Sequence, residues 1–350
     1  MFFLKELKIK DFRCYKSQNF TFFPQKNVFI GKNAVGKTSA VEAIYFLSFA
    51  KSFRTSKEQE LIKKDSENLY LEAKFETNTG TETLEIAYDG KKRSISLNGK
   101  VVRTVSSLVG RFCAVVFCPD DLNIIKLEPQ RRRKLIDISI CQIDKAYLIA
   151  LSQIKRIYKE KSTYLHTYPQ ENADYDYVRA LNSEFIRYST YIIRKRREFI
   201  MELDALAKGI VKSLGISEEI KLNYIPNTEE ENLVKAANDK IGDDVAAKTT
   251  TWGPLRDDLG ILINGQNAQS GASQGQIRTA AIAIKLALVK YYKSMDKNII
   301  VILDDALSEL DKDRQNALFA HLGKDNQVFI TATDIKLIED VQEDTKIINL

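Results

Sequence analysis

The chain of 350 residues is long enough for two domains, or for one large domain that carries an insertion. With 44% hydrophobic and 29% charged residues, its composition is that of an ordinary folded globular protein. No apolar run approaches the roughly 20 residues of a membrane span, so we expect no membrane contact. The net charge of +6 permits polyanion binding without requiring it, and the four cysteines and two histidines form no zinc-ligand pattern.

The N-terminal third alternates apolar and polar residues as β-strands do. Residues 3–12 read "FLKELKIKDF", where a signal peptide would have a continuous apolar core. We therefore expect a first strand there, and a cytoplasmic protein. A further strand is expected over 69–77 and two more within 84–102, with the tight-turn signals Asp-Gly at 89–90 and Asn-Gly at 98–99.

The residue composition and the spacing of apolar residues change in the middle of the chain. Residues 128–215 contain almost no glycine and carry Leu, Ile, Tyr, Lys and Arg at helical spacing, which predicts two or three antiparallel helices. The segment 221–232 is polar, and strand and turn signals return after it. We expect an α/β nucleotide-binding domain built from 1–120 and 236–350, with a helical lobe inserted over 121–235.

A complete phosphate-binding loop opens the first expected helix. The pattern G-x-x-x-x-G-K-[ST] follows an apolar strand and precedes an apolar helix, which is the context that makes this pattern specific. Its glycines let backbone N–H groups converge on a phosphate at a helix N-terminus. We expect Lys37 to reach the β- and γ-phosphates of ATP and Thr38 to bind Mg²⁺. The residues assigned to nucleotide binding here are Gly31, Lys32, Asn33, Ala34, Val35, Gly36, Lys37, Thr38 and Ser39.

Two carboxylates follow a strand that is apolar throughout, residues 300–303. Asp304 is placed to bind Mg²⁺, through water, and Asp305 to orient or deprotonate the attacking water. With Lys37, these two residues form the expected catalytic set. The alternative is that both acidic residues merely cap the next helix. A later buried strand ends in polar residues, of which Thr331 or Thr333 is expected near the γ-phosphate.

A second small-residue loop lies about 30 residues before the carboxylates and lacks a lysine. Ser273, Gly275 and Gln276 match the S-x-G-[QE] signature of ATP-binding-cassette heads, with a helix over 279–292 behind them. Such a loop presents a hydroxyl, N–H groups and a helix N-terminus to the γ-phosphate held by a second subunit. We therefore expect a homodimer with ATP, in which residues 308–311 cross the interface. The alternative is an ordinary capped helix.

The whole chain resembles the RecF family of bacterial recombination proteins, which are relatives of the SMC-type ATPase heads. The segments that carry the resemblance keep the family's order and spacing: "LKELKIKDFRCYKS", "GKNAVGKTSAVEAIYFLS", "KSFRTSKEQELI", "VFCPDDLNIIKLEPQRRRKLID", "WGPLRDDLGILING", "SQGQIRTAAIAIKLA" and "VILDDALSELDKDRQ". The implied fold is an ABC-type ATPase head, with a mixed sheet around the phosphate loop and an inserted helical lobe. Ala34 and Leu255 depart from the family, which usually has glycine and histidine there.

The resemblance also implies a function: a DNA-dependent, slowly hydrolysing ATPase of recombinational repair and replication. It would dimerise with ATP and Mg²⁺ on gapped DNA, single-stranded regions or junctions. With partners resembling RecO and RecR it would help to load a RecA-type recombinase and support the SOS response. Asp305 stands where most cassette ATPases have the longer glutamate, which suits slow hydrolysis. The alternative is a non-DNA ABC-type ATPase, such as a subunit of a transporter or of an anti-phage system.

Clusters of basic residues are the candidates for DNA contact, because they neutralise phosphates and release counterions. We expect backbone contacts with little base specificity. The alternative for the run at 194–197 is a solvated helix face with intrahelical ion pairs. For a further run at 131–134 we expect an internal role, with Arg131 or Arg132 pairing with Asp120 or Asp121. The residues assigned to DNA binding are Lys51, Arg54, Arg194, Lys195, Arg196 and Arg197.

Overall fold

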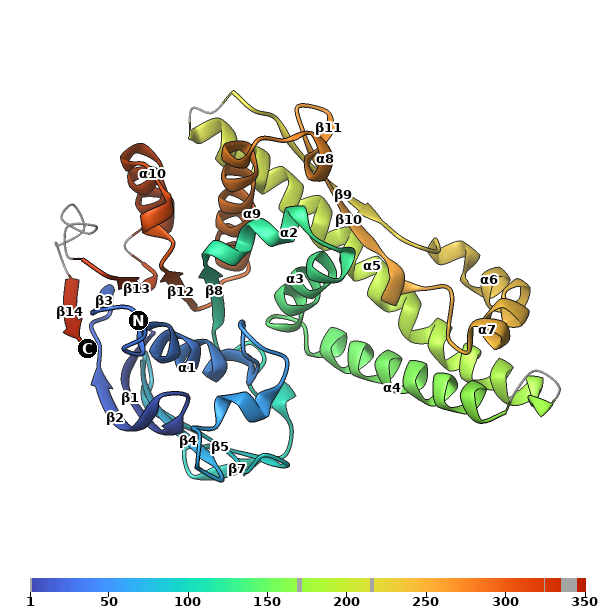
Figure 1. Cartoon of the computed structure of the whole chain (residues 1–350), viewed down its shortest axis with the longest axis horizontal. Coiled ribbons are helices and arrows are strands. Elements are labelled where there is room, and N and C mark those ends of the chain that lie inside the picture. The colour runs from blue at the N-terminus through green and yellow to red at the C-terminus, as the bar shows by residue number, and fades with distance from the viewer. Residues whose placement is uncertain (1, 169–171, 215–216, 324, 335–344) are drawn as a thin grey trace. The chain divides into compact units, whose positions relative to one another are not determined.

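The computed structural model describes residues 2–168, 172–214, 217–323, 325–334 and 345–350. The chain separates into two compact units, one made of Met1–Asp121 with Leu288–Leu350 and the other of Leu122–Ala287 (Figure 1). The second unit extends to Ala287, whereas the sequence placed its end at residue 235. The difference arises because a strand at 220–225 pairs with one at 258–263, which keeps both segments in the same unit.

A parallel sheet positions the nucleotide-type motifs of the first unit. Its strands, in spatial order, are β14 (Thr345–Asn349), β3 (Lys26–Ile30), β13 (Gln327–Ala332), β12 (Ile299–Asp304) and β8 (Cys113–Phe117). Every residue of β8, β12 and β13 is buried, which explains their continuous apolar runs. Because the strands are parallel, the ends of β3, β12 and β13 reach one edge of the sheet.

An antiparallel sheet completes the first unit. Its order is β2 (Tyr15–Thr21), β1 (Phe3–Phe12), β4 (Leu69–Thr77), β5 (Gly80–Tyr88), β6 (Arg93–Leu97) and β7 (Lys100–Val102). The turn predictions are confirmed, since β5 pairs with β6 and β6 with β7, and Gly90 and Gly99 have positive φ. The expected mixed sheet therefore consists of two sheets. Helix α1 (Lys37–Phe49) is buried along nearly its whole length in the core that both sheets line.

Other helical segments of the first unit are short. They are the 3₁₀ turns η1 (Glu58–Leu61), η2 (Val105–Ser107), η3 (Pro119–Asp121) and η7 (Leu307–Glu309), and helix α10 (Lys312–Leu322). Helix α9 (Gln274–Ser294) begins in the second unit and ends in the first.

The second unit is mostly helical. Its helices are α2 (Leu122–Lys126), α3 (Pro129–Cys141), α4 (Lys145–Thr167), α5 (Tyr175–Ser213), α6 (Leu233–Asp239), α7 (Ile241–Ala247) and α8 (Ala268–Gly271), with 3₁₀ turns η5 (Glu230–Asn232) and η6 (Pro254–Arg256). Long antiparallel helices were predicted, and α4 and α5 lie side by side (Figure 1). Each begins at an aspartate whose side chain accepts backbone N–H groups, Asp144 and Asp174.

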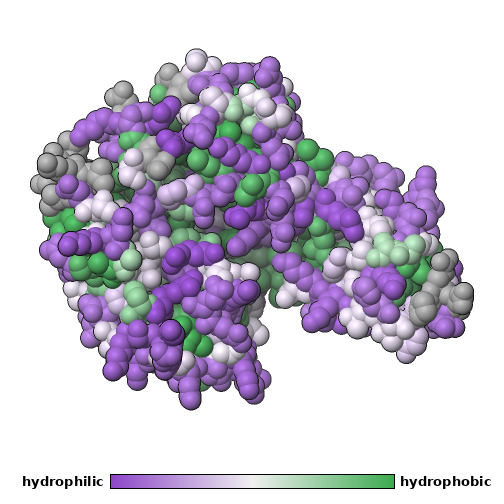
Figure 2. Space-filling model, viewed as in Figure 1, coloured by the Kyte–Doolittle hydropathy of each residue, from purple (hydrophilic) through white to green (hydrophobic). Residues whose placement is uncertain are grey.

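A small sheet of the second unit was anticipated only in part: strand signals were noted after residue 232, but its first strand was missed. It contains β9 (Ile220–Ile225), β10 (Asp258–Ile263) and β11 (Gln266–Asn267). The sequence classed 221–232 as polar, but Ile220 and Leu222 alternate with polar residues and are buried. Within the described residues, no helix is long and apolar enough to cross a membrane. On the face drawn in Figure 2, hydrophobic residues are scattered among hydrophilic ones.

Candidate functional site

The loop between β3 and α1 has the backbone that a phosphate cradle requires. Gly36 has φ +114°, and a Cβ there would lie 2.8 Å from Cys14 Sγ and 2.9 Å from the Tyr15 hydroxyl oxygen. The Tyr15 hydroxyl also donates to the Gly36 carbonyl at 3.1 Å. Ala34 has φ +67°, a left-handed conformation that disfavours alanine. Residues 32–35 are exposed, so the loop is open to a ligand from solvent.

Lys37 and Thr38 start α1 at the base of this loop. The Lys37 ammonium donates to the carbonyls of Gly31 and Lys32 at 2.7 and 2.9 Å, and the side chain is only 5% exposed. The lysine side chain thus lies against the loop, where it would also contact a bound phosphate. The Thr38 hydroxyl donates to Asp304 Oδ1 at 2.9 Å, so residues 266 positions apart meet at the sheet edge, as the motifs predicted.

The carboxylate pair lies at the end of β12. Burial raises the pKa of Asp304, hydrogen bonds from Thr38 and Thr331 lower it, and the charge of Asp305 raises it. The net pKa is higher than that of an ordinary aspartate. Asp305 has φ +51°, and its N–H donates to the Thr331 hydroxyl at 2.9 Å. Neither carboxylate forms an ion pair with a cation of the described residues, so both remain available to a metal or water.

The capping alternative for this pair does not hold. Helix α10 is capped by Asp311, whose side chain accepts the Arg314 N–H at 2.9 Å. Thr331 is buried against the carboxylates, whereas Thr333 is exposed. Ser308 donates to the Asp305 carbonyl at 2.8 Å and so fixes the turn that follows β12.

A buried carboxylate holds the helix behind the loop, and sequence reasoning missed it. Glu42 of α1 is fully buried and accepts two bonds of 2.8 Å from the Arg13 guanidinium. Ser52 and Arg54 also donate to it, at 2.5 and 3.3 Å. Arg54, which was assigned to DNA, therefore pairs with Glu42 behind the phosphate loop. Partners this far apart in the chain leave no local sequence signal.

The second loop begins α9 in the second unit. The Ser273 N–H donates to Gln276 Oε1 at 3.0 Å, and the Gln276 N–H donates to Ser273 Oγ at 3.3 Å. This reciprocal cap stabilises the start of a 21-residue helix. Ser273 and Gly275 are exposed, and the serine hydroxyl keeps its own proton for a further acceptor. The two interpretations of this loop are therefore compatible: Ser273 caps the helix, and its hydroxyl proton remains available to an anion from solvent.

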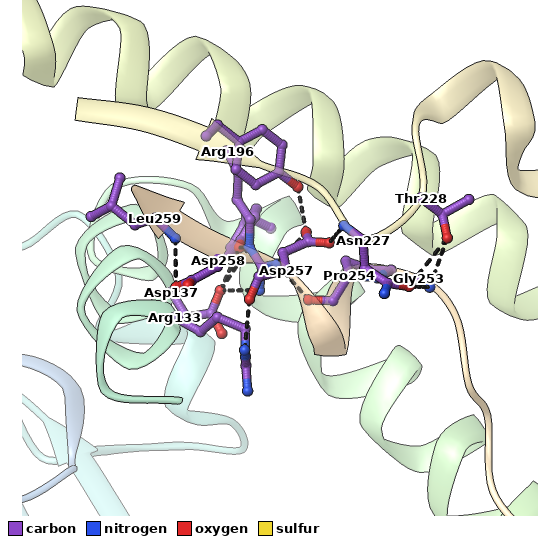
Figure 3. Close-up of polar contacts among 12 residues, drawn as sticks. Arg133, Asp137, Arg196, Asn227, Thr228, Gly253, Pro254, Asp257, Asp258 and Leu259 are labelled. Atoms are coloured by element: carbon purple, nitrogen blue, oxygen red, sulfur yellow. Dashed lines mark hydrogen bonds and ion pairs between the residues drawn. The ribbon is translucent and has the colours of Figure 1, made fainter. Parts of the chain in front are cut away.

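The basic run at 194–197 is not the DNA-facing cluster that the sequence suggested. Arg196 is 1% exposed, and Figure 3 shows its guanidinium enclosed by polar groups. It donates to Asp257 Oδ2 at 2.8 Å, to Asp137 Oδ1 at 2.7 Å and to the Pro254 carbonyl at 2.6 Å. The assignment of Arg196 to DNA binding is therefore wrong, because its charge is buried and already compensated.

The remaining members of that run are paired, with Arg194 and Arg197 exposed and Lys195 half-buried. Arg194 contacts Glu230 at 2.5 Å and Lys195 contacts Glu198 at 2.9 Å. Arg197 pairs with Glu229. In the first unit, Lys51 likewise contacts Glu58, at 2.8 Å. These cations reach solvent, and a DNA phosphate would have to compete with their carboxylate partners.

Within the run at 131–134, Arg132 has the internal role that was expected, but with another partner, whereas Arg131 and Lys134 are exposed. Arg132 is buried and makes a two-bond pair with Asp258, at 2.7 and 2.9 Å. Arg133 donates to the Asp257 carbonyl at 2.6 Å (Figure 3). The prediction paired Arg131 or Arg132 with Asp120 or Asp121, and for Arg132 it is wrong, because its guanidinium donates to Asp258 and to the Leu127 carbonyl. The β10 strand, which begins at Asp258, brings this carboxylate beside α3.

Comparisons with known proteins agree with this geometry. The model of the RecF/RecN/SMC N terminal domain family matches residues 3–349. The DNA replication and repair protein RecF of Shouchella clausii (strain KSM-K16) is 36% identical over 347 residues, which cover 95% of this chain and 93% of that protein. A solved structure of "the recombination mediator protein RecF-ATP in RecFOR pathway" has a TM-score of 0.89 at 30% identity, covering 95% of this chain and 92% of that one.

A more distant structure shows the fold alone. The SMC head bound to the C-winged helix domain of ScpA has a TM-score of 0.55 at 17% identity, covering 99% of this chain and 93% of that one. The fold is therefore that of an ABC-type ATPase head with an inserted helical lobe, as the sequence predicted. With a family match over nearly its whole length and a relative at 36% identity, the chain belongs to the RecF family.

Proposed function

We propose that this protein is an ATP-binding, slowly hydrolysing ATPase that acts on DNA in recombinational repair and replication. The observation that carries the proposal is the 2.9 Å bond between Thr38 Oγ1 and Asp304 Oδ1 beside the phosphate loop. It joins the phosphate-binding and carboxylate motifs at one edge of the parallel sheet. The related RecF structure that was solved with ATP supports the choice of nucleotide.

The residues present fit ATP with Mg²⁺. The Lys37 ammonium, now bound to two loop carbonyls, would exchange them for phosphate oxygens. Thr38 and Asp304 supply the hard oxygen ligands that Mg²⁺ prefers, and Mg²⁺ would neutralise charge on the phosphates. Asp305 would orient the attacking water. A short carboxylate on a left-handed backbone position has little freedom to follow the water, which agrees with slow hydrolysis.

The second loop supports a dimer that closes around two ATP molecules. Ser273 and Gly275 face solvent at the start of α9, where N–H groups and the helix dipole favour an anion. A second copy of the chain would supply that anion as the γ-phosphate on its own loop. Gln276 would hold the serine in place through the reciprocal cap, and residues 308–311 would lie at the interface.

The DNA would be gapped or contain a junction, held through its phosphates. The cations proposed for contact are Lys51, Arg54, Arg194, Lys195 and Arg197. The related structure belongs to the RecFOR pathway, which supports partners resembling RecO and RecR. With them, the ATP-bound dimer would help to load a RecA-type recombinase and support the SOS response.

Sedimentation velocity and ATPase rates with and without gapped duplex DNA test this proposal. The Asp305→Asn variant, which slows turnover, should form a dimer with ATP and Mg²⁺, and gapped DNA should raise the ATPase rate of the parent protein. Lys37→Ala is the matched control and should remain monomeric under all conditions. The proposal would be contradicted if the parent protein stayed monomeric with saturating ATP and its ATPase rate did not change with DNA.

A further inference from the structure

The threonine at the end of β13 occupies a central place in the carboxylate site. Strand β13 lies between β3, which leads into the phosphate loop, and β12, which ends at Asp304. Thr331 is paired in register with Asp304 on one side and with Phe29 on the other. It is 2% exposed. Its hydroxyl is therefore fixed by the sheet at the point where both motifs converge.

Within the described residues, the Thr331 hydroxyl forms its hydrogen bonds with the carboxylate pair. It lies 3.0 Å from Asp304 Oδ1 and 3.4 Å from Asp305 Oδ1. It accepts the Asp305 N–H at 2.9 Å. A hydroxyl has one proton, so it can donate fully to only one carboxylate at a time. The shorter distance assigns that proton to Asp304 in this structure.

We propose that Thr331 is a positioning residue that holds both carboxylates and passes its hydrogen bond from Asp304 to Asp305 when Asp304 engages Mg²⁺. This inference rests on the proposed ATPase function. The hydroxyl protons of Thr38 and Thr331 both stabilise the charge of Asp304. If Asp304 held Mg²⁺, it would need the Thr331 proton less, and Asp305 would become the better acceptor for it. A small rotation of the hydroxyl would then fix Asp305 for the attacking water.

Thr331 also stabilises the backbone conformation of Asp305. A left-handed conformation is unfavourable for aspartate, although less so than for most residues. The bond from the Asp305 N–H to Thr331 anchors this conformation directly after the strand ends. The same hydroxyl lies 3.0 Å from Asp304 Oδ1, so it contacts both residues of the pair.

The test compares Thr331→Val, which keeps the shape and removes the hydroxyl, with Thr331→Ser, which keeps the hydroxyl. Thr250→Val is the matched control, because Thr250 is also buried and its hydroxyl has no hydrogen-bond partner among the described residues. For each protein, binding of a fluorescent ATP analogue is titrated with Mg²⁺, and ATP hydrolysis is followed in single-turnover experiments. Affinity without Mg²⁺ reports on the phosphate loop alone.

Thr331→Val should bind the analogue without Mg²⁺ as the parent does. Its half-saturating Mg²⁺ concentration should rise about tenfold and its hydrolysis rate should fall roughly 10- to 100-fold, the effect of losing a hydrogen bond to a charged group. Thr331→Ser should stay within about threefold of the parent in both measurements. Thr250→Val should match the parent.

Two results would overturn the inference while leaving the proposed function intact. One is a Thr331→Val variant with parental Mg²⁺ dependence and parental hydrolysis. The other is a Thr331→Ser variant as impaired as valine, which would show that packing rather than the hydroxyl matters. A parent that binds no nucleotide would instead contradict the proposed function, and the inference with it.

Discussion

Two clusters of charged residues in this molecule differ in what they leave for a ligand. At the end of β12, Asp304 and Asp305 lie side by side without an ion pair to any cation of the described residues. In the second unit, Arg196 lies between Asp137 and Asp257 and is compensated on both sides (Figure 3). Both clusters are largely buried. The difference teaches that clustered charge indicates a binding site only where the fold leaves that charge uncompensated.

The Arg196 cluster is compensated almost completely. Its guanidinium also donates to the Tyr147 hydroxyl at 3.0 Å, and that hydroxyl donates to Asp137 at 2.6 Å. On the other carboxylate, Asp257 accepts from the Asn227 N–H at 2.8 Å and from the Tyr224 hydroxyl. The cluster thus joins α3, α4 and α5 to the segment that leads into β10. Its role is to hold these elements together.

Removing the arginine is the strongest test of this contrast. Arg196→Ala would leave two buried carboxylates without their cation, so we expect the free energy of unfolding to fall by about 3–5 kcal/mol. Urea denaturation followed by circular dichroism measures the change. Arg194→Ala is the matched control from the same run and should lower stability far less, since its ion pair is exposed. Equal losses for the two variants would contradict the structural role of Arg196.

Neutralising the other cluster should have the opposite effect on stability. Asp304→Asn keeps an oxygen that accepts from Thr38 and Thr331 but removes a buried charge next to Asp305. We expect the ligand-free variant to be at least as stable as the parent. The variant should lose the stabilisation that bound Mg²⁺-ATP gives. For the parent, this stabilisation is about 2.7 kcal/mol when the Mg²⁺-ATP concentration is 100 times its Kd. Thermal unfolding with and without Mg²⁺-ATP measures both effects.

The raised pKa of Asp304 also sets a pH dependence. The carboxyl group of Asp304 holds a proton more tightly in the folded state than in the unfolded chain. Burying its charged form therefore lowers the stability of the fold above the folded-state pKa, and this loss disappears as the pH falls through that pKa. Protonated Asp304 cannot hold Mg²⁺, so Mg²⁺-dependent nucleotide binding should decline as the pH falls. The decline should occur at a higher pH than for an aspartate with the ordinary pKa of about 3.9. Binding titrations across acidic pH test this, and a decline only near that ordinary value would contradict it.

The two clusters also show what the sequence can predict. The phosphate loop and the carboxylates were found because each motif is contiguous and its flanking strand and helix are visible in the chain. Arg196 was misassigned because four adjacent cations were treated as one surface. A local signal was present, since Ile192, Arg196, Phe199 and Leu203 share the spacing of a buried helix face, and all four are buried.

Other parts of the site had no such signal. The bond from Arg13 to Glu42 joins residues that are 29 positions apart. It depends on how α1 packs against the sheet, and no local sequence pattern reveals that packing. For the strand end at 331–333, the sequence indicated polar residues near the γ-phosphate but could not show that Thr331 donates to Asp304. The same holds for β9, whose buried face becomes clear only from its pairing with β10.

A smaller effect is expected where exposed cations face exposed carboxylates. If Arg194 and Arg197 contact DNA, the double variant Glu229→Gln, Glu230→Gln should free them and strengthen binding. The slope of log affinity against log salt should steepen by about 0.9 for each additional phosphate that these arginines neutralise. Fluorescence anisotropy with gapped duplex at several salt concentrations measures the slope. The control, Arg194→Gln with Arg197→Gln, should make it shallower, and an unchanged slope in both variants would remove this surface from the DNA site.

The smallest effect is expected in the phosphate loop itself. Ala34 has φ +67°, a conformation that glycine adopts without steric cost. The left-handed conformation costs alanine about 1–2 kcal/mol, whereas glycine loses about 0.4–1 kcal/mol through its more flexible unfolded state. Ala34→Gly should therefore stabilise the protein by roughly 0–1.6 kcal/mol and leave nucleotide affinity within a few-fold of the parent. Gly36→Ala is the opposing control, since its Cβ would collide with Cys14 and Tyr15 and should abolish nucleotide binding. Equal behaviour of the two variants would show that the loop adjusts its backbone, and that its left-handed positions do not define the cradle.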